Sequence, residues 1–161
     1  MKVKLIEKSV VDLVVTGIDP VRVDKPSSHF DHETLPKEWV EPRLIAYNPP
    51  GNSKFGQETD ALTVQVKCYV KTQPKGRSDL PMADLVDRVR AILDPTEGAA
   101  PIKIVDLAGT TVVGIFNVVT VAVDFQWDVT ETFNEGEVAG LDVATVVFDG
   151  HVSAVRGDCT P

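Results

Sequence analysis

The residues that most resemble a chemical site lie in the stretch SHFDHE, residues 28–33. Its two histidines and two acids are residue types that bind metal ions. However, four ligands within six residues cannot all converge on one ion without a special turn. The only other histidine in the chain is His151, and no Cys-x-x-Cys pair accompanies the stretch. We therefore interpret it as a polar loop and expect no metal site.

Catalytic motifs are the second kind of chemistry to consider. KTQPKGRS, residues 71–78, contains Lys, Gly and Ser but not in the G-x-x-x-x-G-K-[ST] order of a phosphate-binding loop. No G-x-S-x-G elbow or G-x-G-x-x-G fingerprint occurs. Asp84 and Asp87 would share the solvent-exposed face of a predicted helix with Arg88 and Arg90. Such exposed charges are typical of a helix surface that only contacts solvent. We expect no catalytic residues, no cofactor and no enzyme activity.

The acids of the chain are distributed unevenly. There are 16 Lys and Arg against 24 Asp and Glu, so the net charge is −8. Residues 104–155 contain no Lys or Arg and hold eight of the acids, which leaves the rest of the chain neutral. Such an asymmetry indicates either a solvated loop or an electrostatic field that serves a function. Aromatic residues are 6% and the bases are spread, which is not the pattern of a nucleic-acid-binding surface.

A strand and a helix in succession give the clearest structural pattern. Hydrophobic residues at every second position from 62 to 70, Cys68 included, predict a strand with one buried face. QPKG, residues 73–76, predicts a turn, and a helix capped by Ser78 or Asp79 follows, with Pro81 in its first turn. Asp94-Pro95 ends that helix. The wet face of the strand is predicted to hold Thr63, Gln65, Lys67, Tyr69 and Lys71, and the buried face of the helix Met82, Leu85, Val86, Val89, Ile92 and Leu93.

An earlier helix and several further strands complete the set. Residues 2–16 predict a helix that Gly17 ends, with Val3, Ile6, Val10, Leu13 and Val14 on one face. Short strands are expected at 21–23, at 39–47, where Pro42 requires an edge or a bulge, and at 102–107. Residues 111–127 predict a long strand with a bulge near Gly114 or Asn117. An acidic loop is expected at 129–143, and a hairpin turning at Asp149-Gly150 after it.

The predicted fold is α+β, a mostly antiparallel sheet with two helices packed on one face. The length of 161 residues indicates a single domain, 1–161, with long loops at 24–38 and 48–60 and an acidic extension at 129–161. No run of 18 apolar residues occurs, and the N-terminus lacks the features of a signal peptide. We therefore expect synthesis in a reducing cytosol and no association with a membrane.

The order of these elements carries a resemblance to a known family. An N-terminal helix and an edge strand lead to an alternating strand, a V-K-x-x-P connector, the helix SDLPMADLVDRVRAIL and paired long strands. This order resembles the tail terminator (tail-completion) proteins of long-tailed bacteriophages, and related head–tail joining proteins, over about residues 1–128. The resemblance implies a structural virion protein that forms a ring, usually hexameric, at the head-proximal end of the tail. That ring would end tube growth and join tail to head.

The resemblance also implies partners and a location. The partners would be further copies of the chain, the tail tube protein, and a head connector or neck protein, while DNA would pass through without specific binding. The chain would be assembled in the host cytoplasm and reside in the virion. The candidate contacts to an acidic neighbour are Lys71, Lys75 and Arg77, and the candidate acids of the ring lumen are Asp128, Glu131, Glu135, Glu137 and Asp142.

Two alternatives remain open from the sequence. One is a neck or head-closure protein of an adjacent ring. The other is a small cytosolic α+β protein that binds a ligand or acts as an enzyme.

Overall fold

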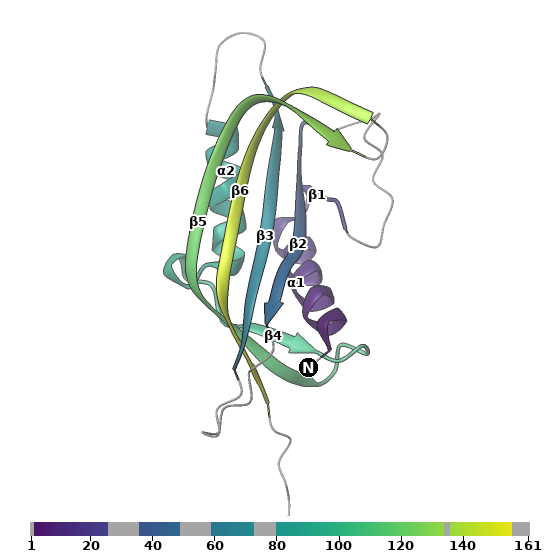
Figure 1. Ribbon diagram of the computed structural model, residues 1–161, viewed down its shortest axis with the longest axis vertical. Helices are drawn as coiled ribbons and strands as arrows, with labels where there is room; N and C mark the ends of the chain where they lie inside the picture. The colour runs from purple at the N-terminus through teal and green to yellow at the C-terminus, as the bar shows by residue number, and fades with distance from the viewer. Residues whose placement is uncertain (1, 26–35, 49–58, 73–79, 134–135, 156–161) are drawn as a thin grey trace, which may run out of the picture.

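The computed structural model describes residues 2–25, 36–48, 59–72, 80–133 and 136–155. In these residues two α-helices, one short 3₁₀ helix and one six-stranded sheet form an α+β fold, as predicted (Figure 1). The strand order is β1-β2-β3-β6-β5-β4, and only the β1–β2 pair is parallel. The elements are α1 (Val3–Ile18), β1 (Arg22–Val23), β2 (Glu38–Asn48), β3 (Thr59–Lys71), α2 (Leu80–Leu93), η1 (Pro95–Glu97), β4 (Ile102–Val105), β5 (Val112–Phe133) and β6 (Gly136–Ala154).

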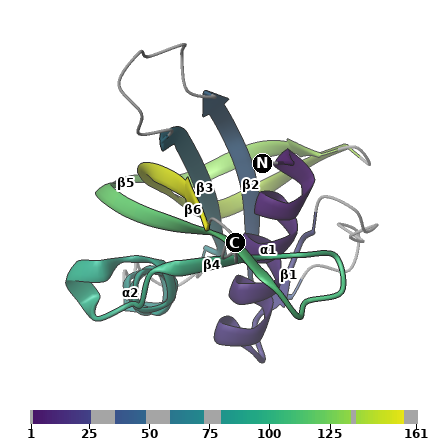
Figure 2. The same ribbon diagram turned by 90° about the horizontal axis from the view of Figure 1, so that it is seen from below.

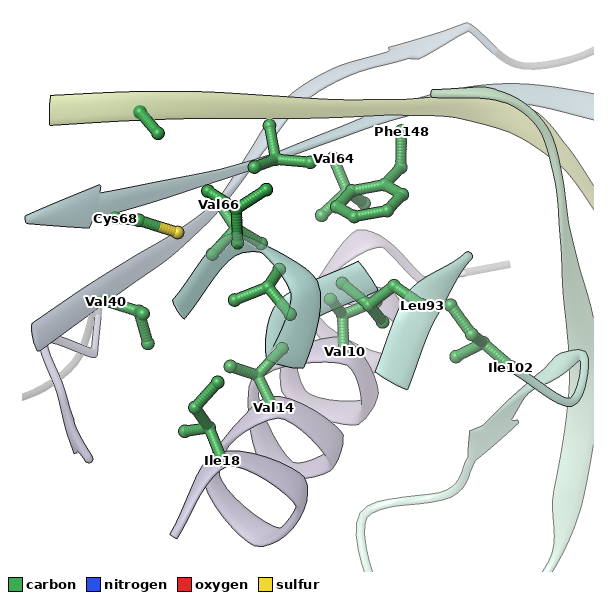
Figure 3. Packing of buried hydrophobic residues seen from close by; sticks show 14 of the residues in the cluster. Val10, Val14, Ile18, Val40, Val64, Val66, Cys68, Leu93, Ile102 and Phe148 are labelled. Carbon is green, nitrogen blue, oxygen red and sulfur yellow. The ribbon is translucent and has the colours of Figure 1, made fainter. Parts of the chain in front are cut away.

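Both helices cover the same face of the sheet, and the main hydrophobic core lies between the two layers (Figures 1 and 2). Figure 3 shows side chains of α1 and α2 meeting those of the central strands. The predicted face of α2 is confirmed, with Ile92 half-buried and the others buried. The predicted face of α1 is wrong at Val3 and Leu13, which are 45% and 36% exposed. Val11 and Ile18 are buried instead. Val11 lies beside Pro42 and Leu44 of β2, and Ile18 belongs to the main core.

Gly17 does not end α1 as the sequence suggested, since the helix continues to Ile18. A Cβ atom at Gly17 would lie 2.8 Å from side-chain atoms of Ile92. The glycine therefore allows α1 and α2 to approach each other closely.

Strand β3 alternates as predicted, with one exception. Leu62, Val64 and the following alternate residues are buried under the helices, and Cys68 is fully buried among them. Burial, followed by the charge of Glu38, raises the pKa of the Cys68 thiol to about 12. Tyr69 was expected on the wet face but is only 1% exposed. A second, smaller cluster covers it on the side away from the helices.

The predictions for the last third of the chain need the largest correction. The segment 129–143 was expected to be an acidic loop, but β5 extends to Phe133 and β6 begins at Gly136. The expected hairpin turn at Asp149-Gly150 is also wrong, because both residues lie within the continuous strand β6. The long strand has a register shift between Val118 and Thr120, close to the predicted bulge position at Asn117.

Gly150 is required by packing rather than by a turn. A Cβ atom there would lie only 2.0 Å from the backbone oxygen of Asn117 on β5. We expect Gly150→Ala to lower the free energy of unfolding by about 1–3 kcal/mol, because the backbone must shift to relieve the overlap. Urea unfolding of the variant checks this value. Gly109→Ala is not a suitable control since its φ is +74°, so the comparison is with Ala122→Ser on the exposed surface of β5.

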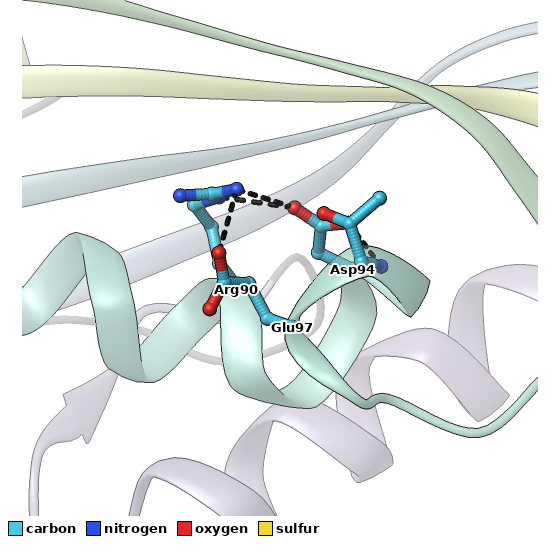
Figure 4. A network of polar contacts seen from close by, with 4 residues as sticks. Arg90, Asp94 and Glu97 are labelled. Carbon is cyan, nitrogen blue, oxygen red and sulfur yellow. Dashed lines mark hydrogen bonds and ion pairs between the residues drawn. The ribbon is translucent and has the colours of Figure 1, made fainter.

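The end of α2 is fixed by a polar network, which Figure 4 shows. The Asp94 carboxylate accepts hydrogen bonds from Arg90 Nε at 3.0 Å and from the Thr96 backbone N–H at 2.9 Å. Arg90 also forms an ion pair with Glu97 at 3.1 Å. The helix ends before Pro95, as predicted, and Asp94 caps the following 3₁₀ turn.

The same network predicts a pH dependence of stability. Burial alone would raise the pKa of the Asp94 carboxyl, but the hydrogen bonds from Thr96 and Arg90 outweigh it and lower the pKa. The stabilisation is therefore fully present above the unfolded pKa of about 4, and it is lost as the pH falls through the pKa of the folded state. We expect Asp94→Asn to cost about 1–3 kcal/mol at neutral pH. The difference from wild type should shrink below about pH 4, and a constant difference in urea titrations would contradict this account.

Strand β2 contains Pro42 because that position lies at an open edge. The Val40 carbonyl accepts a hydrogen bond from the Asp24 N–H, on the side where β1 lies. Two residues on, the backbone of Pro42 faces the same side, where its missing N–H interrupts no pairing with β3. The Pro42 carbonyl accepts from Arg43 Nη1 at 2.9 Å. The predicted edge position is confirmed.

Several predictions fall outside the described residues. They are the turn at 73–76, the helix cap at Ser78 or Asp79, the SHFDHE stretch, and all but the ends of the loops at 24–38 and 48–60.

Candidate assembly surface

The paired ends of β5 and β6 fold back over the sheet, on the face opposite the helices. We call residues 129–133 and 136–141 the hairpin end. Register shifts on either side of Val129 interrupt the pairing, and Asp128 has a φ of +50°. Gly140, at φ +71°, allows β6 to bend at the same level. Figure 1 shows the two strands turning at the top and crossing toward β2.

Aromatic packing holds the hairpin end in this position. Trp39 of β2 stacks on Tyr69 of β3 at 4.8 Å between ring centroids, with an interplanar angle of 9°. Phe133 from the hairpin end lies 6.3 Å from Trp39 and 5.8 Å from Tyr69. Leu141 and Val143 complete the buried part of this second cluster. The sequence did not reveal it, because Tyr69 occupies a position that alternation assigns to solvent.

A buried carboxylate supports the same bend. Asp142 is 5% exposed and accepts hydrogen bonds from Thr72 Oγ1 and from the Asp128 backbone N–H, both at 2.9 Å. Asp142 was a candidate lumen acid, but in the structure its carboxylate links β6 to Asp128 of β5 and to Thr72, the residue after β3. These two hydrogen bonds explain why position 142 is an acid, and no role on a charged surface is needed to explain it.

The other candidate lumen acids lie on or beside the hairpin end. Asp128 and Glu137 are exposed, and Glu131 is half-buried. Burial, with Glu41 and Glu131 adding negative charge, raises the pKa of the Tyr69 hydroxyl well above its usual value. Glu135 lies outside the described residues.

Of the three candidate contact cations, the structure describes only Lys71. It is exposed at the end of β3, and its backbone N–H donates to the Lys37 carbonyl at 2.9 Å. Its strand neighbour on β6 is Leu141, so Lys71 lies at the base of the hairpin end. Lys75 and Arg77 lie outside the described residues.

The sheet has two long open edges. Strand β4 pairs with β5 only as far as Phe116, and β1 pairs with β2 only at Trp39 and Val40. Among the described residues, no strand pairs with the outer edge of β5 over 117–133 or of β2 over 41–48. These edges carry large exposed hydrophobic side chains, namely Ile45 at 53%, Val119 at 67% and Phe125 at 42%.

Charge separates the two halves of the sheet. Strands β5 and β6 carry six described acids and no Lys or Arg. The described residues of 22–72, which include β1, β2 and β3, carry six cations and four acids. The cations are Arg22, Lys25, Lys37, Arg43, Lys67 and Lys71. The flank of β4, β5 and β6 is therefore acidic, even with Lys103 of β4 and with Asp142 buried, and the other flank has a slight excess of positive charge.

Two grooves lie on the helix side. One, of about 560 Å³, lies between the start of α1 and the β4–β5 turn, where Leu107 is 58% exposed. The other, of about 640 Å³, lies between α1 and the segment 98–105. Their acids are engaged locally, Asp106 by the Thr110 N–H and hydroxyl, and Asp12 by Lys8. The linings are mostly apolar, and these contacts do not form an arrangement for acid–base chemistry.

Further polar pairs are likewise local. Tyr47 donates its hydroxyl to the Asp60 carboxylate, and burial together with Asp60 raises the pKa of Tyr47 to about 12. Within the described part of the chain, no three His, Cys, Asp or Glu side chains are grouped so as to hold a metal ion.

Neither of the described helices is both long enough and apolar enough to cross a membrane. No protein-family model matches the chain, and no curated protein matches its sequence.

Proposed function

We propose that the chain is a structural virion protein whose copies form a ring at the head-proximal end of a bacteriophage tail. The ring ends growth of the tail tube and joins the tail to the head. The station in the virion and the hexameric order follow from the resemblance in the order of elements. The tendency to assemble has support from the structure itself.

The observation that carries the proposal is the charge separation between the two flanks of the sheet. Opposite charges on two different surfaces favour contact between the acidic flank of one copy and the other flank of the next. Such head-to-tail contacts are heterologous, and they generate a closed ring when the rotation between copies closes. A symmetric dimer would instead bring like surfaces together.

The position of the acids also fits a ring with a negative lumen. Asp124 and Asp149 lie on the face of the sheet away from the helices, and the hairpin end adds Glu131 and Glu137 on that side. If this face lines the channel, its charge repels the phosphate backbone of DNA that passes through. A ring in which residues 128–149 formed the outer rim would contradict this assignment.

The test combines mass with shape. Light scattering and negative-stain microscopy of the purified chain, over a range of protein and salt concentrations, should reveal rings with a central hole. Higher salt should weaken the rings, because it screens the charges between flanks. Added tail tubes should then be capped at one end. Rings that ignore tubes but bind a head connector would favour the neck protein, and a monomer that neither forms rings nor caps tubes would favour the ligand-binding alternative.

A further inference from the structure

The two open edges lie at the same position along the strand direction. We call two residues level when the register of the strands between them connects one to the other. The register connects Leu44 of β2 through Val64 and Phe148 to Val121 of β5. In the same way, Glu41 is level with Asp124, and Asn48 is level with Asn117. The open part of β2, residues 41–48, is therefore level with residues 117–124 of β5, which are also open.

We propose that neighbouring copies join by sheet continuation, with residues 117–124 of β5 in one copy pairing with residues 41–48 of β2 in the next. This inference rests on the proposed ring and names its interface. A closed ring has no axial rise from one copy to the next, so it brings together edges at equal levels. The backbone N–H and C=O groups of both edges, which no other described strand pairs with, supply the hydrogen bonds.

Strand direction fits this pairing. The four long strands β2, β3, β6 and β5 alternate in direction, so β2 and β5 run opposite to each other. Rotation about an axis along the strands preserves these directions. The edge of β5 therefore meets β2 of the next copy in antiparallel orientation, as in every pairing of the long strands within the chain. All helices then lie on one side of the continued sheet.

The side chains at the two edges also fit each other. Ile45 lies at the register shift between Leu44 and Ala46, and Val119 lies at the shift between Val118 and Thr120. Both are more than half exposed, and they are separated by about one row of the register. Edges that must avoid pairing usually present charges such as Lys at exposed positions. Here each matching segment instead presents an exposed β-branched apolar side chain, that of Ile45 or Val119.

Charge and backbone chemistry define the segment further. Asp124 of one copy would lie diagonally across from Arg43 of the next, within reach of a long side chain. Pro42 cannot donate to the new ladder, and its carbonyl already accepts from Arg43. The ladder bonds are therefore expected between residues 44–48 and 117–121.

Charge insertion tests the apolar contact. Ile45→Lys and Val119→Lys should each raise the protein concentration needed for ring assembly by at least about tenfold, because a lysine would be desolvated in the contact. Their thermal unfolding should match wild type, since both side chains are exposed in the single copy. Leu107→Lys is the matched control, since Leu107 is 58% exposed but lies at the β4–β5 turn, and it should assemble normally.

Crosslinking tests the register directly. The variant Ala46→Cys/Thr120→Cys, with Cys159→Ser to remove the terminal thiol, is treated with a short bismaleimide. Residues 46 and 120 are level with each other, through Thr63 and Asp149. A ladder of covalent multimers up to the ring size is expected. The variants with only one of the two introduced cysteines should give no ladder. The pair Ala46→Cys/Thr132→Cys should give none either.

The outcomes separate the interface from the ring. Rings that form without a ladder, and that tolerate lysine at 45 and 119, overturn the sheet continuation and leave the proposed function standing. A chain that stays monomeric at all concentrations, without a ladder, and fails to cap tail tubes overturns both.

Discussion

Val64→Asp is expected to unfold the protein at room temperature, or to lower its free energy of unfolding by about 4 kcal/mol or more. Val64 is 1% exposed in the centre of β3 and belongs to the main core beneath the helices. An aspartate there would be an unpaired carboxylate without water, since the surrounding core is apolar. Because domains of this size are stable by only about 5–15 kcal/mol, a loss of this size is close to the whole margin.

The matched control for this substitution is Gln65→Asp. Gln65 is the next residue of β3, is half-buried, and pairs with Arg43 on β2, so an acid there has a cation across the strands. Urea unfolding followed by far-UV circular dichroism compares the two variants. Equal stabilities for Val64→Asp and wild type would refute the assigned face of β3.

Trp39→Ala is expected to cost about 3–5 kcal/mol and to release the hairpin end. Trp39 is fully buried, stacks on Tyr69, and supports Phe133. Its removal leaves a cavity between the sheet and the hairpin end, where the remaining buried residues of the cluster are Tyr69, Leu141 and Val143. Hydrogen exchange should therefore increase first at the amides of 129–133 and 136–141, while β3 stays protected.

Phe125→Ala is the control for loss of an aromatic ring. Phe125 stacks on Trp127 at 5.6 Å between centroids but is 42% exposed, so its truncation leaves no closed cavity. It should cost much less than Trp39→Ala and leave the exchange of the hairpin end unchanged. If Trp39→Ala lost stability without faster exchange in 129–141, the second cluster would not be what holds the hairpin.

The sequence predicted those elements whose pattern is local. The period-two alternation of β3 and the helical spacing of α2 were correct, since each places its apolar side chains toward one core. The sequence predicted two short strands in place of the continuous β6, because Asp149-Gly150 has the composition of a turn. The close approach of Asn117 that requires glycine at position 150 comes from another strand. Tyr69 was assigned to solvent for a similar reason, because the hairpin end that covers it is distant in the chain.

The candidate site was predictable only in part. The cluster of acids in the last third of the chain was evident in the sequence, but the buried role of Asp142 depends on partners at Thr72 and on the bend at Asp128. Pro42 indicated the edge at β2, but the extent of the open edges could not be predicted, because it depends on how far β1 and β4 extend. Residues 41–48 of β2 and 117–124 of β5 lie at the same position along the strands because four strands are in register. No local sequence pattern encodes this register.

Chemical labelling of the buried Cys68 thiol can report the opening of the protein core. The Cys68 side chain is inaccessible and its pKa is about 12, so at neutral pH almost no reactive thiolate is present in the native state. In a Cys159→Ser background, modification by a thiol reagent would require the core between α1, α2 and the sheet to open. The labelling rate would then measure the opening equilibrium without denaturant. Applied to free and assembled protein, it would reveal how much the ring restrains each subunit.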